Sequence, residues 1–86
     1  MSTLITFDEI RHLLVEELGL DPARIRDASQ TLADVGLDSL SLATLMAVTL
    51  ERYGFELGIE DIDALNTLRD VVDLFNTRLV EKDLPI

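Results

Sequence analysis

The chain has 86 residues, of which seven are Lys or Arg, seventeen are Asp or Glu and 48% are hydrophobic, so its formal net charge is -10. A chain of this length is enough for one compact acidic domain spanning residues 1–86 and too short for a second core. The negative charge excludes nucleic-acid phosphates and anionic membrane surfaces as partners, and it favours proteins with basic docking surfaces.

Cysteine is absent, which excludes a disulfide framework and a catalytic thiolate and leaves one His with carboxylates for any zinc site. The first residues lack the charged start and apolar run of a secretory leader. No stretch approaches the ~20 apolar residues of a membrane span. We therefore expect a cytoplasmic monomer.

A first helix is predicted over residues 6–18. It begins with a capping box formed by Thr6 and Glu9, carries apolar residues at three- and four-residue spacing, and ends before Gly19. A long connection follows. In it, Thr31 and Asp34 are spaced to cap a single turn.

Three further helices are predicted over residues 39–53, 59–65 and 67–81, and no strand is expected. Residues 82–86 form a tail that we expect to be mobile. The fold class is therefore all-α. We expect a small antiparallel bundle of three longer helices and one short helix, with a long loop between the first and second helices.

The start of the second helix carries the residues best suited to chemistry. Ser39 follows the carboxylate of Asp38 and a turn that contains Gly36, which leaves its hydroxyl open to an incoming enzyme. A phosphate ester on Ser39 would meet the unpaired amides and partial positive charge of a helix N-terminus. The alternative is that Asp38 or Ser39 is only an N-cap.

From Phe7 to Leu79 the sequence resembles the acyl carrier protein family, and in particular its free-standing members. The resemblance is carried by the approach at 32–36, the Gly-Leu-Asp-Ser-Leu motif at 36–40, the Glu-Arg-Tyr-Gly end of the second helix at 51–54, and the Thr67-Leu68 start of the last helix.

The resemblance implies that a magnesium-dependent phosphopantetheinyl transferase attaches a phosphopantetheine arm from coenzyme A to Ser39. Asp38 would be the acidic neighbour that caps the helix. The arm would carry acyl intermediates as thioesters and present them to acyl-transferring and ketosynthase-type enzymes of fatty acid, polyketide or related biosynthesis. The protein itself would be no enzyme.

Residues 40–50 contain no charged side chain, whereas carriers of primary fatty acid synthesis usually place acids early in this helix. The helix is either unusually buried or has an apolar outer face for docking, and we favour docking. Gly58 also replaces a common proline, and both features suggest a specialised carrier. The candidate docking residues are Leu40, Ala43, Thr44, Ala47, Leu50, Glu51, Glu60 and Asp61.

A bound acyl chain is expected to enter between the second and third helices. The candidate contact residues are Leu42, Met46, Ile62 and Leu65. Core packing is an equally good explanation for Leu42 and Met46.

Other functions have weaker support. Ser39, Asp38 and His12 supply the residue types of a hydrolytic triad, but the spacing and the absence of a Gly-x-Ser-x-Gly elbow argue against one. Asp61 and Asp63 begin a pattern that fails as a calcium loop, and no metal site is predicted. A peptidyl or aminoacyl carrier, or an acidic helical adaptor without a prosthetic group, remains as an alternative.

Overall fold

A computed structural model describes residues 4–83 of the chain. The helices are α1 (Phe7–Leu18), the 3-10 helix η1 (Pro22–Arg24), α2 (Ser39–Tyr53), α3 (Ile59–Asp63) and α4 (Leu68–Asp83). The described residues contain no strand, and the predicted all-α bundle of three longer helices and one short helix is confirmed. Within the same range, no helix has both the length and the apolar character needed to cross a membrane.

Local capping explains where the first two long helices begin and end. Thr6 Oγ1 accepts the N–H of Glu9 at 3.2 Å at the start of α1. Both α1 and α2 end at a glycine in the left-handed region, with φ 72° at Gly19 and 74° at Gly54, a conformation that side chains with a Cβ rarely adopt. These termini lie where the sequence predicts them.

The last two helices differ from the predicted ranges. α3 ends at Asp63 instead of residue 65, because the Leu65 N–H donates to the Ile62 carbonyl and tightens the chain into a turn. α4 continues through Lys82 and Asp83, which the sequence assigns to a mobile tail. Lys82 Nζ donates to the Tyr53 carbonyl at 2.8 Å and ties this last turn to the end of α2. The remainder of the predicted tail lies outside the described residues.

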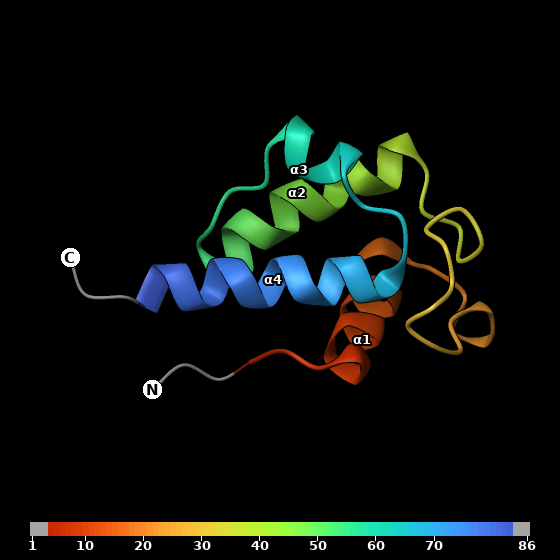
Figure 1. Ribbon diagram of the computed structural model, residues 1–86. Coiled ribbons are helices and arrows are strands. Elements are labelled where there is room, and N and C mark those ends of the chain that lie inside the picture. Colours follow the sequence, from red (N-terminus) through yellow and green to blue (C-terminus); the bar gives the residue numbers. More distant parts are fainter. Residues whose placement is uncertain (1–3, 84–86) are drawn as a thin grey trace.

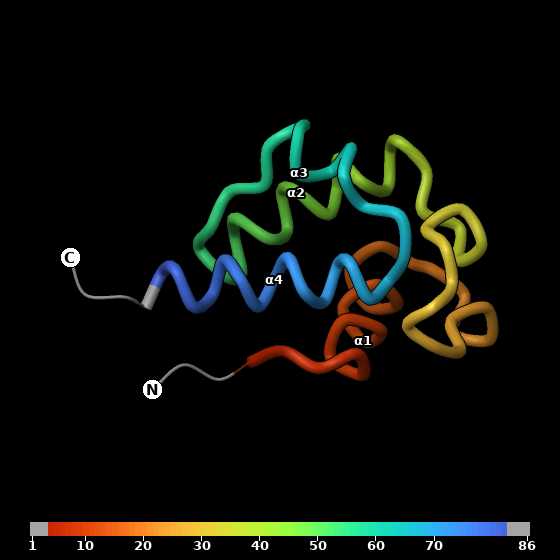
Figure 2. The backbone as a smooth tube through the Cα atoms, viewed as in Figure 1, coloured from red at the N-terminus to blue at the C-terminus, as the bar shows by residue number. Residues whose placement is uncertain are grey.

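Figures 1 and 2 show α2 and α4 running in the same direction, with the long connection between α1 and α2 gathered at the end where both begin. α1 packs against both α2 and α4. α3 lies beside α2 on the return path to the start of α4. The start of α2, where Ser39 lies, is therefore close to the connecting loops.

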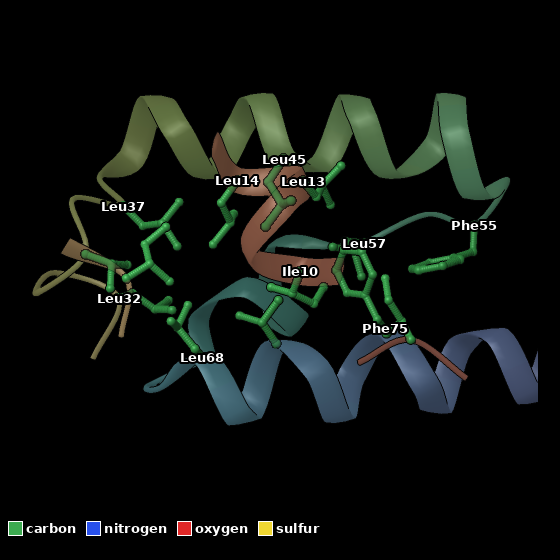
Figure 3. Close-up of a cluster of buried hydrophobic side chains, with 14 residues drawn as sticks. Ile10, Leu13, Leu14, Leu32, Leu37, Leu45, Phe55, Leu57, Leu68 and Phe75 are labelled. Atoms are coloured by element: carbon green, nitrogen blue, oxygen red, sulfur yellow. The ribbon is translucent and has the colours of Figure 1, made fainter. Parts of the chain in front are cut away.

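The hydrophobic core lies between α2 and α4 and is closed by α1 and the long connection (Figure 3). α2 buries only Leu45 and Thr49 completely, and α3 buries no residue. Both helices therefore leave apolar side chains at the surface. The buried apolar residues are Ile5, Ile10, Leu13, Leu14, Ile25, Leu32, Val35, Leu37, Leu45, Phe55, Leu57, Leu68, Val71 and Phe75.

The long connection is hydrogen-bonded to the start of α4. Backbone N–H groups of Leu68 and Arg69 donate to the carbonyls of Gln30 and Ala28 at 3.0 and 2.8 Å, and the Leu32 N–H donates to Asn66 at 3.1 Å. The buried Gln30 side chain also accepts and donates hydrogen bonds within the loop. Because these backbone groups are paired, the segment leading to α2 has a defined conformation.

Candidate functional site

Ser39 is the first residue of α2, and its side chain is exposed. Asp38 is the N-cap: its backbone is extended, and its Oδ1 accepts the N–H of Ser41 at 2.8 Å. This N–H, followed by the Ser41 hydroxyl, lowers the pKa of the Asp38 carboxyl below its usual value. Asp38 is therefore the helix cap, and the Ser39 hydroxyl is left for other chemistry.

The turn before Asp38 is shaped by a close approach of Arg24. Gly36 has φ 91°, and a Cβ there would lie 3.3 Å from Nη1 of Arg24. The Nη2 of Arg24 donates to the Asp34 carbonyl at 3.0 Å, and the Leu37 side chain is buried. A glycine is needed here for the backbone conformation, and a Cβ would also require a small shift of the Arg24 side chain. This turn brings the chain out of the core immediately before Ser39.

An apolar groove of about 280 Å³ opens beside Ser39 between α2 and α3. Of the four predicted acyl-contact residues, Leu42, Met46 and Ile62 line it. Leu65 does not line it. All four residues are partly buried and pack against the core, so core packing and groove lining are combined in Leu42, Met46 and Ile62. The complete lining is Ser39, Leu42, Ala43, Met46, Ile59, Ile62 and Asp63.

Two groove residues were missed by the sequence reasoning. Ile59 is 72% exposed and precedes Ile62 by one helical step of three residues, so the periodicity offered a signal for it. The sequence places Asp63 only in the acidic pattern that fails as a calcium loop, and no sequence signal places it at the groove.

The outer face of α2 exposes the predicted docking residues. Leu40 is 77% and Leu50 is 49% exposed, and a second apolar groove of about 420 Å³ lies at Leu50 and Leu57. This second groove shares Ala43 and Met46 with the groove beside Ser39. The other exposed candidates are Ala43, Thr44, Ala47, Glu51 and Glu60.

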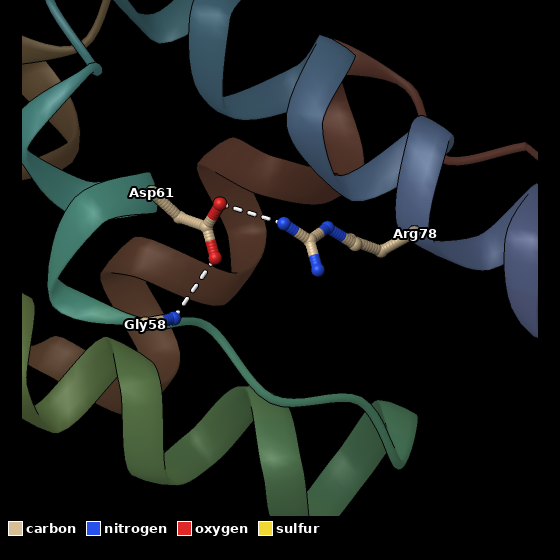
Figure 4. A network of polar contacts seen from close by, with 3 residues as sticks. All are labelled: Gly58, Asp61 and Arg78. Atoms are coloured by element: carbon tan, nitrogen blue, oxygen red, sulfur yellow. Dashed lines mark hydrogen bonds and ion pairs between the residues drawn. The ribbon is translucent and has the colours of Figure 1, made fainter.

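Asp61 differs from the other docking candidates because its carboxylate is engaged inside the protein. Its Oδ1 accepts from Arg78 Nη2 of α4 at 2.6 Å, and its Oδ2 accepts from the Gly58 N–H at 2.9 Å (Figure 4). Glu60, one residue earlier, is exposed. Glu60 is therefore the more accessible charge for a partner.

The arrangement does not assemble a hydrolytic triad. His12 lines a separate groove with Arg52 and Tyr53, which lie at the end of α2, whereas Ser39 begins that helix. Fifteen helical residues span about 22 Å at 1.5 Å per residue.

In the part of the chain that the structure describes, no group of three or more His, Asp or Glu side chains is placed to hold a metal ion.

The site fits a phosphodiester-linked group. The Ser39 hydroxyl is exposed at a helix N-terminus, where the first-turn amides favour an anion, and the adjacent groove offers apolar surface to whatever the group carries. Ser39 would hold such a group, with Asp38 keeping the helix start in place.

Comparisons with known proteins agree with this geometry. A family model described as a phosphopantetheine attachment site matches residues 8–75. An acyl carrier protein of Chlamydia caviae is 32% identical over 71 residues, 83% of this chain and 92% of the relative. The actinorhodin holo acyl carrier protein from S. coelicolor is 33% identical with a TM-score of 0.75, and the match covers 94% of this chain and 98% of that one. The 3,5-dioxohexyl form of the carrier from the actinorhodin polyketide synthase gives a TM-score of 0.77 at 33% identity with the same coverage.

Proposed function

The chain belongs to the acyl carrier protein family, whose prosthetic group is phosphopantetheine, and we propose that Ser39 is the residue that receives this arm. The observation that carries the proposal is the exposed Ser39 hydroxyl at the first position of α2, beside an apolar groove. When bound, the arm supplies a terminal thiol that holds acyl groups as thioesters.

Asp38 has a supporting role in this proposal. Its carboxylate keeps the first turn of α2 capped through Ser41, so the hydroxyl of Ser39 is presented from a fixed backbone. The hydrogen bonds from Ser41 that lower the pKa of Asp38 also stabilise its negative charge. That charge adds to the potential that attracts the metal-containing site of a transferase. His12 lies in a groove at the opposite end of α2 from Ser39, and we propose that the protein is a carrier on which partner enzymes act.

We further propose that the cargo belongs to a polyketide or another specialised pathway. Support comes from the uncharged 40–50 segment of α2 and from the likeness to carriers of the actinorhodin polyketide synthase. Leu42, Met46 and Ile62 would contact the acyl chain, because each methylene that leaves water contributes ~0.8 kcal/mol. The proposed setting is the cytoplasm, with a phosphopantetheinyl transferase and ketosynthase-type enzymes as partners.

The test is the intact mass of the protein after incubation with coenzyme A, Mg²⁺ and a broad-specificity phosphopantetheinyl transferase. The wild type should gain one phosphopantetheinyl group, and Ser39→Ala should gain none. Because Asp38 is the cap, Ser39→Ala should change stability by no more than about 0.5 kcal/mol. Ser41→Ala, two residues further along the same helix, keeps the backbone N–H that Asp38 accepts; it is the matched control and should be loaded normally. An unmodified wild type would instead favour an adaptor without a prosthetic group.

A further inference from the structure

We propose that Arg78, which reaches from α4, sets the width of the groove beside Ser39 and thereby the length of acyl chain that the protein shelters. The inference rests on the proposed use of this groove for cargo. Arg78 does not line the groove, and it forms an ion pair with Asp61 of α3. It is therefore a positioning residue that acts on the wall of the groove.

Apart from Ile62, which is partly buried and packs against the core, α3 has few other means of being held in place. It is five residues long and buries none of them, and its first residue, Ile59, is 72% exposed. A helix this short has no stability of its own, because one turn gains too few hydrogen bonds to offset the ordering of its backbone. Its position must come from contacts with other elements.

The Asp61 carboxylate provides such a contact in two directions. One oxygen accepts from Arg78 at 2.6 Å and the other from the Gly58 N–H, which precedes α3, at 2.9 Å (Figure 4). The side chains of Arg78 and Asp61 are 32% and 24% exposed, so water screens this pair less than a fully exposed one. Charge-assisted hydrogen bonds of this kind are stronger than neutral ones.

One side of α3 lines the groove, and the opposite side contacts α4. Ile59 and Asp63 are four residues apart and share one face of the helix, and both line the groove. Asp61 lies two residues from each, which directs it to the other side, toward α4. The ion pair therefore fixes the side of α3 that faces α4, while the opposite side of α3 forms one wall of the groove. A shift of α3 would change the groove width without moving the start of α2.

A second ion pair offers a matched control. Arg52 of α2 pairs with Glu17 of α1, and their side chains are 51% and 36% exposed. Neither residue lines the groove beside Ser39. Loss of this pair removes a comparable surface interaction and leaves α3 untouched.

The experiment loads the protein with acyl groups from butyryl to dodecanoyl and measures how far each raises the melting temperature above that of the holo form. In the wild type the increase should grow with chain length and stop once the groove is filled. In Arg78→Gln and in Asp61→Asn, which keeps an oxygen to cap Gly58, the increase should continue to longer chains. Arg78→Lys should restore most of the wild-type limit, and Arg52→Gln should leave it unchanged.

Hydrogen exchange of the unloaded protein tests the same contact without cargo. The amides of Ile62 and Ala64, which donate to the carbonyls of Gly58 and Glu60, should exchange roughly three- to tenfold faster in Arg78→Gln than in the wild type, while those of α2 keep their rates. If Arg78→Gln lowered the melting temperature of all forms equally and the stabilisation still stopped at the wild-type chain length, Arg78 would have only a structural role. That result would overturn the proposal. A wild type with no dependence on chain length would overturn it too, whereas attachment at Ser39 is judged separately by mass.

Discussion

Replacing Leu40 by Ala should slow acyl transfer to a partner enzyme and hardly change stability. Burying a whole Leu side chain contributes about 1.5–3 kcal/mol. Since Leu40 is 77% exposed, a partner that covers it would gain about 1–2 kcal/mol, which is roughly tenfold in affinity. Leu50 is 49% exposed, so Leu50→Ala should cost about two thirds as much free energy of binding. Leu40→Ala should keep its stability within about 0.5 kcal/mol, whereas Leu50→Ala should lose about 1 kcal/mol, because about half of Leu50 is buried in the free protein.

The assay is transfer from the acyl form to its cognate ketosynthase-type partner, combined with urea unfolding of each variant. Leu45→Ala is the contrast on the same helix, because Leu45 is fully buried and its loss should cost ~2–5 kcal/mol of stability. Glu60→Gln and added salt should have modest effects, since exposed charges act over a Debye length of ~8 Å. Transfer that collapses with salt or with Glu60→Gln, and is indifferent to Leu40 and Leu50, would refute apolar docking.

Two further predictions concern the groove and the response to pH. NMR shifts caused by an octanoyl group should reach Leu42 and Met46 in the wild type. They should become larger there in Ile62→Ala, because the smaller side chain widens the groove. Shifts confined to the surroundings of Ser39 would mean that the cargo is not sheltered. The N–H groups of Asn66 and Thr67 lower the pKa of Asp70 from 3.8, so its contribution to stability is complete above the unfolded-state pKa of ~3.9 and is lost as pH falls through the folded-state value. In urea unfolding, the stability difference between wild type and Asp70→Asn should therefore shrink below about pH 4, and a difference that is constant with pH would contradict this.

The start of α2 could be predicted from the sequence because capping is local. The acceptor oxygen of Asp38 and the amide of Ser41 are three residues apart, so the pattern alone contains both partners. The glycines that end α1 and α2 are likewise recognised without tertiary information, since a left-handed residue is needed there. The candidate attachment residue follows from the same local signal.

The walls of the groove could not be assigned in the same way. The three-residue spacing of Ile59, Ile62 and Leu65 shows that they are neighbours on a helix, but it does not say which neighbours face α2. After the turn at Asp63, Leu65 packs against the core without lining the groove, whereas Ile59 lines the groove. The role of Asp61 depends on Arg78, seventeen residues away in the sequence, and no local pattern connects them.

α4 holds both the loop that leads to Ser39 and the helix α3 that forms a wall of the groove, but through interactions of different strength. Its first turn is joined through backbone hydrogen bonds to the loop that leads to Ser39, and its later part holds α3 through Arg78. The backbone pairs lie within a defined loop and break only if that loop unfolds, whereas the side-chain pair is partly exposed and opens at lower cost. Loss of the Arg78–Asp61 pair should therefore let α3 yield to a longer acyl chain, while Ser39 keeps the position from which, in the proposed function, partner enzymes reach the arm.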